Sequence, residues 1–193
     1  MEFQIRRATT GDAPEVALLT RAAYAKWVPV IGREPLPMRA DYEAAVREHL
    51  VDLLHIDGVL AGLVEMIPEP QWLLIENLAV APAFQGRGCA RILLEHAQQV
   101  ARGQQLQGLR LFTNKQFASN VDLYLHHGFD VDREEPIEDR APERAEFAAR
   151  ISRESLSGKR RVVPVDQQLA LDLQRALILA RYAVRRAVGQ RQC

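Results

Sequence analysis

A short stretch between an apolar run and a helical pattern holds residues suited to binding phosphate. The apolar run Trp72–Val80 is followed by Gln85 and the triplet Gly86-Arg87-Gly88, and helical spacing of apolar residues begins two positions later. A strand that leads through a glycine-containing turn into a helix directs free backbone N–H groups and the positive helix end toward one spot. Glycine lets the backbone approach a phosphate closely, and Arg87 can add a charge-assisted hydrogen bond. The pattern predicts a phosphate-binding turn, and its alternative is an ordinary strand-to-helix turn.

Two common nucleotide-binding motifs are excluded by the residues that they require. A dinucleotide fingerprint needs a third glycine where this chain has Arg91. A Walker A loop needs a lysine followed by a hydroxyl residue, and neither follows Gly88. The phosphate-bearing ligand predicted for this turn is therefore bound by another kind of motif.

The spacing Gln85-x-x-Gly88-x-Ala90 after an apolar strand resembles the coenzyme A signature of the GNAT acetyltransferase superfamily. A second stretch, from Asn120 to Phe129, resembles the family's second motif of an asparagine, a helical tyrosine and a closing Gly-Phe pair. The two motifs stand in the expected order with one strand between them, and the resemblance covers roughly residues 3–135. Ala90 stands where many members have glycine, although alanine also occurs in the pattern.

The resemblance implies acetyl-CoA as the co-substrate and assigns residues to its binding. The backbone of Leu78, Ala79 and Val80 is expected to pair with the pantetheine arm, as a sheet pairs with an added strand. Asn120 is the family position that hydrogen-bonds the pantetheine region. The pyrophosphate is expected on the backbone of the turn and of the first helical residues, namely Gln85, Gly86, Arg87, Gly88, Cys89 and Ala90.

Acetyl transfer to an amine requires a base, because an amine with a pKa near 10.4 is neutral in only about one part in a thousand at pH 7. Glu76 is the candidate base, acting directly or through water, and Glu65 on the neighbouring strand is its substitute. The alternative is that Glu76 is a strand carboxylate that faces solvent or an arginine. The resemblance also places a backbone N–H near Leu78 where it can stabilise an oxyanion if the strand bulges there.

Tyr124 occupies the family's general-acid position and is expected to protonate the departing sulfur. It lies between Leu123 and Leu125, so the alternative is a core residue of an amphipathic helix. Cys89 stands at a helix start, which can lower the pKa of a thiol, but it is interpreted as a small buried residue.

The acceptor is expected to contact the proline-rich segment 28–38, which follows the first helical pattern. Three prolines and a glycine predict a loop there, at the place where members of the resembled family frame the acceptor. Trp27, Arg33 and Met38 are the candidate substrate residues. The acceptor is predicted to be a small molecule or a peptide with a primary amine, and the sequence does not choose between them.

The elements that position these residues follow from hydrophobic periodicity and turn signals. Two apolar runs around Asp57-Gly58 predict a hairpin, and a third run after it completes an antiparallel meander. The fold class is α+β, with a mixed, mainly antiparallel sheet and helices on both faces. Strands are predicted at 3–8, 51–56, 59–66, 72–80, 109–113 and 129–134, and helices at 13–27, 41–49, 88–103 and 118–127.

The chain is divided into an acetyltransferase domain at 1–137 and a C-terminal extension at 138–193. Members of the resembled family have one more strand soon after the Gly-Phe pair, and here it is predicted near 161–165 or is absent. A long amphipathic helix is predicted at 166–188, and its apolar face needs a partner surface, so a homodimer or another protein partner is expected to cover it.

The composition excludes several other classes of protein. Lysine plus arginine and aspartate plus glutamate number 25 each, so no net field attracts nucleic acid or an anionic membrane. The sequence shows neither a secretory signal nor an apolar stretch of membrane-spanning length, and a cytoplasmic location is expected by default. Two cysteines are too few for a disulfide framework or a zinc site, so no metal is expected.

These observations predict an N-acetyltransferase that moves acetyl from acetyl-CoA to a primary amine by direct attack in a ternary complex. The alternatives are a sensor that holds an acyl-CoA without turnover, or a scaffold whose main function lies in the C-terminal helix.

Overall fold

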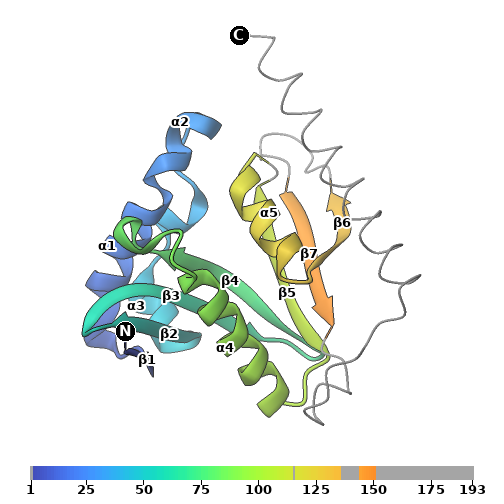
Figure 1. The fold of residues 1–193 in the computed structure, drawn as a ribbon, viewed down its shortest axis with the longest axis horizontal. Coiled ribbons are helices and arrows are strands. Elements are labelled where there is room, and N and C mark those ends of the chain that lie inside the picture. Colours follow the sequence, from blue (N-terminus) through green and yellow to red (C-terminus); the bar gives the residue numbers. More distant parts are fainter. Residues whose placement is uncertain (1, 115, 136–143, 151–193) are drawn as a thin grey trace.

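The computed structural model describes residues 2–114, 116–135 and 144–150, and these residues form a mixed sheet covered by helices (Figure 1). The described part of the sheet has seven strands in the order β1-β2-β3-β4-β5-β7-β6. The β4–β5 pair is parallel and the other pairs are antiparallel. The strands are β1 (Phe3–Arg7), β2 (Leu50–Ile56), β3 (Val59–Pro68), β4 (Trp72–Val80), β5 (Gly108–Asn114), β6 (Asp130–Glu135) and β7 (Arg144–Arg150).

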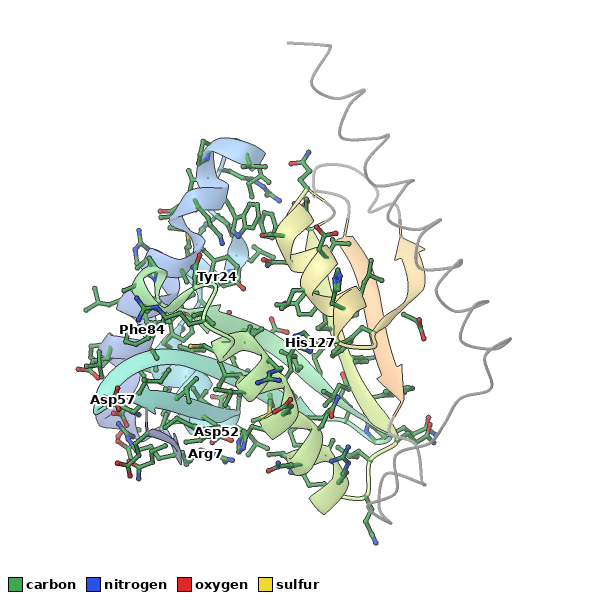
Figure 2. The ribbon with its side chains drawn as sticks, in the orientation of Figure 1. Arg7, Tyr24, Asp52, Asp57, Phe84 and His127 are labelled. Atoms are coloured by element: carbon green, nitrogen blue, oxygen red, sulfur yellow. The ribbon has the colours of Figure 1, made fainter. Side chains whose placement is uncertain are left out.

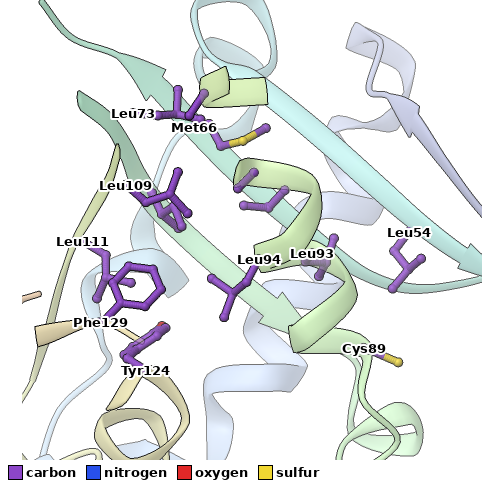
Figure 3. Packing of buried hydrophobic residues seen from close by; sticks show 14 of the residues in the cluster. Leu54, Met66, Leu73, Cys89, Leu93, Leu94, Leu109, Leu111, Tyr124 and Phe129 are labelled. Carbon is purple, nitrogen blue, oxygen red and sulfur yellow. The ribbon is translucent and has the colours of Figure 1, made fainter. Parts of the chain in front are cut away.

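Helices cover both faces of this sheet, as the sequence predicted. On one face, α4 and α5 pack against β2–β5 in a hydrophobic cluster that includes Leu93, Leu109 and Phe129 (Figure 3). On the other face, α1 and α3 pack against β2, β3 and β4 in a second cluster. The helices are α1 (Ala13–Tyr24), α2 (Val28–Ile31), α3 (Tyr42–Glu48), α4 (Cys89–Gly103) and α5 (Ala118–His126).

The predicted hairpin is confirmed between β2 and β3. Asp57 and Gly58 form a two-residue loop with φ values of 48° and 81°, so both central residues are left-handed. Their neighbours Ile56 and Val59 pair directly across the hairpin. This is the geometry in which a two-residue turn matches the twist of its strands, which is why aspartate followed by glycine identified it in the sequence.

The segment after α1 differs from the predicted continuous helix and loop. Helix α1 ends at Tyr24, a 3-10 turn covers Ala25–Trp27, and the short helix α2 follows where a loop was predicted. Proline is tolerated in the first turn of a helix because the N–H that it lacks has no intrahelical partner, so Pro29 starts α2 rather than preventing it. Gly32, at φ 69°, then ends α2.

The sheet continues past residue 137, where the domain was predicted to end. Strand β7 lies between β5 and β6, and its residue Phe147 pairs with Leu111 of β5. The segment Arg144–Arg150 contains three alanines and no β-branched residue, so its composition carried no strand signal. The strand predicted near 161–165 and the helix predicted at 166–188 lie outside the described residues.

Prediction for a close contact in the sheet. A Cβ added to Gly62 of β3 would stand 2.9 Å from Ala79 O on β4 and 3.1 Å from Leu93 Cδ1 on α4. We expect Gly62→Ala to lower the free energy of unfolding by about 1–3 kcal/mol, because a backbone oxygen cannot move aside as a flexible side chain does. Urea denaturation measures this. Gly103→Ala, in the open last turn of α4, is the control and should leave stability equal or slightly raised.

Candidate functional site

The site begins with an extra residue in β4. Glu65 of β3 pairs with Asn77 of β4, but the next residue, Met66, pairs with Ile75, so Glu76 has no partner in the register and forms a bulge. Pairing between β4 and β5 covers only Trp72–Ile75. A bulge bends its strand, so β4 leaves β5 at this point. Figure 1 shows the two strands together at one end and apart at the other, where α5 stands opposite α1.

Two cavities, each of about 370 Å³, lie along the part of β4 that has left β5. The turn-side cavity is bounded by the end of β4, the turn 84–88, the start of α4 and one face of α5. The α3-side cavity is bounded by α3, the segment 31–37, β4 and β5. Both cavities are lined by the same four residues, Tyr24, Leu78, Asn120 and Tyr124, so they meet at one place.

The turn-side cavity contains the predicted phosphate turn. Gly86 and Gly88 have φ values of 75° and 82°, and Gly88 is the N-cap of α4. The N–H of Ile92 donates to Gly88 O at 3.2 Å, so the N–H groups of the three helical residues before it have no intrahelical acceptor. These donors and the positive helix end suit an anion. The structure therefore offers the kind of site that the glycine spacing predicted.

Side chains fix this turn to its surroundings. Gln85 donates from Nε2 to Val80 O at 2.9 Å and accepts at Oε1 from Lys26 Nζ at 3.0 Å. Arg87 is exposed, its guanidinium lies 5.6 Å from the Phe84 ring centroid, and it does not line the cavity. In the described residues, the Arg87 side chain therefore lies away from the anion site to which it was predicted to contribute.

Most of the predicted cofactor residues come together here. The turn-side cavity is lined by Leu78, Ala79, Val80, Gln85, Gly86, Gly88, Cys89, Ala90 and Asn120. Cys89 is 1% exposed, and burial raises the pKa of its thiol, which agrees with its interpretation as a small buried residue. Further lining residues that were not identified from the sequence include Tyr24, Lys26, Ser119 and His127. Tyr24 and His127 project from α1 and from the end of α5, on either side of this space (Figure 2).

Tyr124 is both a packed residue and a residue of the site. It is 6% exposed, its ring centroid lies 5.7 Å from that of Phe129, and it lines both cavities. Burial raises the pKa of its hydroxyl, so the group stays neutral at physiological pH. The two interpretations that the sequence left open, acid and core residue, therefore do not exclude each other.

A buried polar network holds β4 beside the bulge. Asn77 is 3% exposed and accepts at Oδ1 from Tyr24 OH at 3.0 Å. Its Nδ2 donates to Tyr42 OH at 3.1 Å and to Thr20 Oγ1 at 3.3 Å, and Tyr42 OH donates to Pro37 O at 2.7 Å. Burial raises the pKa of Tyr24 well above its usual value and that of Tyr42 to about 12. Both tyrosines thus remain neutral hydrogen-bond partners.

Among the glutamates that line the α3-side cavity, Glu65 and Glu76 have different environments. Glu76, at the bulge, is exposed. Glu65 is 4% exposed, and its Oε1 lies 2.6 Å from His49 Nδ1. Burial raises the pKa of Glu65, and its contact with His49 only partly offsets this effect. The structure therefore supplies one solvated carboxylate and one buried carboxylate that is paired with an imidazole.

The three residues predicted to contact the acceptor do not come together. Arg33 lines the α3-side cavity. Trp27 lines the turn-side cavity instead, where its ring is stacked on Phe117 with centroids 4.5 Å apart and planes 18° apart. Met38 is 8% exposed and lines neither cavity, and its carbonyl accepts a hydrogen bond from Arg21 at 2.9 Å. Met38 is therefore a packing residue, because the 3-10 turn Leu36–Arg39 directs it into the protein interior.

Solved structures of N-acetyltransferases share this fold. A PaiA N-acetyltransferase from Thermoplasma acidophilum, in complex with coenzyme A, has a TM-score of 0.67 at 17% identity, covering 78% of this chain and 100% of that one. The ribosomal-protein-S18-alanine N-acetyltransferase from Escherichia coli has a TM-score of 0.60 at 21% identity, covering 78% and 95%. A GNAT family acetyltransferase from Elizabethkingia anophelis with acetyl-CoA bound has a TM-score of 0.56 at 18% identity, covering 77% and 98%. The chain thus shares its fold with these three proteins.

The amino-acid sequence gives a more specific assignment than the fold. The acetyltransferase (GNAT) family model matches residues 17–129, which is more than half of the 193 residues. The chain therefore belongs to the GNAT acetyltransferase family. The matched region begins within α1 and ends at Phe129, so it includes every residue that lines either cavity. The resemblance predicted from the two sequence motifs is confirmed at the level of the family.

The described part of the chain contains neither a membrane-spanning helix nor a metal-binding cluster of side chains. None of its helices combines the length and the apolar character that a membrane span requires. Within the same residues, no three or more His, Cys, Asp or Glu side chains gather in a way that would hold a metal ion.

Prediction for the buried network. We expect Asn77→Ala to lower the free energy of unfolding by about 1–3 kcal/mol, because it takes away the acceptor of the buried Tyr24 hydroxyl and the amide that donates to the buried Tyr42 hydroxyl. Urea denaturation followed by circular dichroism measures the change. Gln99→Ala on the exposed side of α4 should stay within about 0.5 kcal/mol of the wild type. Equal stability of Asn77→Ala and the wild type would contradict the role of the network.

Proposed function

We propose that this protein is an N-acetyltransferase that transfers acetyl from acetyl-CoA to a primary amine by direct attack in a ternary complex. The observation that carries the proposal is the junction of the two cavities at Leu78, Asn120 and Tyr124, beside the bulge of β4. One cavity suits a phosphate-bearing ligand, the other contains carboxylates, and a neutral tyrosine stands between them. The family assignment agrees with this division.

The residues present fit acetyl-CoA. The N–H groups at the start of α4 and the left-handed Gly86 and Gly88 suit its pyrophosphate, because no side chain stands between the backbone and the anion. The edge of β4 from Leu78 to Val80 has no β5 partner in the described register, so it can pair with the pantetheine arm as with an added strand. Asn120 lines both cavities where the arm would pass between them. When bound, acetyl-CoA supplies an activated acetyl thioester.

The acceptor enters the α3-side cavity, where Arg33 lies at the loop and Glu76 at the bulge. Glu76 is the first candidate for the base, acting directly or through water, because it is the exposed carboxylate beside the junction. The proposed acceptor is a small-molecule or peptide amine. A cationic amine is favoured near carboxylates, which also line this cavity at Asp41 and Glu48.

The neighbouring groups then complete the transfer. The backbone N–H of Leu78, next to the bulge, would stabilise the developing oxyanion. The hydroxyl of Tyr124, which is protonated at neutral pH, gives its proton to the departing sulfur. Both groups belong to the residues that the two cavities share.

Prediction for the cofactor site. We expect the wild type to bind acetyl-CoA and Gly88→Glu to bind it about 100-fold more weakly or worse, because a carboxylate then stands where the phosphates would lie. Titration calorimetry measures both affinities. Gly58→Glu is a matched control, since Gly58 at φ 81° imposes the same backbone strain as Gly88 at φ 82° and lies at a remote hairpin. Absence of binding to the wild type would contradict the proposal.

Prediction for the general acid. Tyr124→Phe keeps the ring that packs near Phe129 and removes the hydroxyl. We expect kcat to fall about 100-fold or more with little change in affinity for acetyl-CoA, because the sulfur then leaves without a proton donor. Steady-state kinetics with an amine found by screening measures this. If binding persists but no amine is acetylated by the wild type, a sensor that holds acyl-CoA without turnover explains the site better.

A further inference from the structure

The α3-side cavity contains an imidazole that is held by a buried carboxylate. His49 is the C-cap of α3, where its extended backbone (φ −112°, ψ 168°) leads the chain into β2 and its N–H donates to Ala45 O at 2.8 Å. Its Nδ1 lies 2.6 Å from Glu65 Oε1. The side chain of Glu65 is 5% exposed and that of His49 is 28% exposed, so the pair extends from the protein interior to the cavity.

This contact determines which nitrogen of His49 faces the acceptor. With Glu65 ionised, its oxygen can only accept, so Nδ1 of His49 carries the proton in the 2.6 Å contact. In the neutral ring, Nε2 then carries the lone pair, and the carboxylate fixes the ring orientation. No hydrogen-bond partner for Nε2 is found among the residues that the structure describes. An imidazole in this state is prepared to accept a proton.

The pair also lies beside the site of the proposed reaction. Glu65 is the register partner of Asn77, which stands between the bulge residue Glu76 and Leu78. The negative charge of Glu76 is among the effects that raise the pKa of Glu65, which shows that the two carboxylates are close enough to interact. His49, Glu65 and Glu76 all line the α3-side cavity.

We propose that His49, oriented by Glu65, is the general base that takes the proton from the ammonium form of the acceptor. This inference rests on the proposed N-acetyltransferase function. His49 would be a catalytic residue that touches the amine, and Glu65 a positioning residue that acts through it. Glu76 then serves to attract the ammonium group to the bulge rather than to carry its proton.

The proton balance of the step is complete. The ammonium group gives one proton to His49 Nε2, and the neutral nitrogen forms a bond to the acetyl carbon as the carbon–sulfur bond breaks. The nitrogen loses its second proton when the amide forms. This proton replaces the one that Tyr124 gives to the sulfur, so Tyr124 ends the step neutral. His49 returns its proton to solvent, to which it is partly exposed. One proton is released in each turnover.

The chemistry of the two candidate bases favours the imidazole. An imidazole is a stronger base than a carboxylate, so this kind of group is the better match for proton transfer near pH 7. The other charged or titratable groups around the same cavity are Tyr24 on α1, Arg33 before α3, Asp41, Tyr42 and Glu48 at α3, Glu65 on β3, Glu76 on β4 and Tyr124 on α5.

The test is the pH dependence of kcat/KM for an acceptor amine in the wild type and in His49→Gln. The wild type should lose activity toward acid pH with an inflection, because a base that already holds a proton cannot take one from the ammonium group. His49→Gln should be about 100-fold less active and should lose that inflection, with unchanged affinity for acetyl-CoA in calorimetry. His55→Gln on β2, which lines neither cavity, is the matched control and should behave as the wild type.

Two further variants separate a catalytic role from a structural one. Glu65→Gln keeps an oxygen that can accept from Nδ1, but it removes the charge that stabilises the imidazolium, so the inflection should move to lower pH. Added imidazole should partly restore the activity of His49→Ala, as expected when a base is missing and the fold is intact. Thermal unfolding shows whether each variant is folded. If His49→Gln is unfolded, the pH profile of Glu65→Gln is the test: an inflection at lower pH supports the role of His49, and an unmoved inflection contradicts it.

The outcomes distinguish this inference from the proposed function. An active wild type with a His49→Gln variant of equal activity and unchanged pH profile would overturn the role of His49 alone. The loss of the inflection in Glu76→Gln instead of His49→Gln would return the base to Glu76. A wild type that binds acetyl-CoA and acetylates no amine would overturn the proposed function and, with it, this inference.

Discussion

Glu76 is one residue more than β3 can pair with, and the bulge that it forms ends the pairing between β4 and β5 at Ile75. The other features of the site depend on this local mismatch. Because β4 turns away from β5, its last residues keep a free edge, and the two cavities lie along that edge. Because β5 continues beside β7 to Asn114, the second wall of the site remains in place.

Packing on both faces of the sheet holds the strands in this arrangement. The hydrophobic cluster around α4 and α5 joins the paired ends of β4 and β5 to the helix that begins at the phosphate turn. On the other face, α1 and α3 add a second apolar cluster and the polar network of Asn77. A buried amide with satisfied partners specifies one arrangement more strictly than apolar contacts do, since any other arrangement leaves polar groups unpaired. The open edge of β4 is thus held in one position.

The sequence predicted the parts of this structure that depend on local patterns. The hairpin at Asp57, the turn at Gly88 and the helix that carries Tyr124 follow from turn chemistry and periodicity, and they are found where expected. Contacts between distant segments were not predicted. The network of Asn77 was not predicted, because its partners are 35 to 57 residues away in the sequence. Met38 was predicted to contact the acceptor, but the 3-10 turn Leu36–Arg39 buries its side chain. Strand β7 was not predicted, because its alanines and charged residues are not typical of a strand.

The central claim is that the cofactor binds along the edge of β4 and on the first turn of α4. Backbone amide hydrogen exchange with and without acetyl-CoA tests it directly, since exchange reports hydrogen bonds at individual amides. The account predicts slower exchange, by about tenfold or more, at the amides of 77–80 and 86–91, with no change in β1 and β2. Slower exchange confined to other segments, or none at saturating acetyl-CoA, would contradict it.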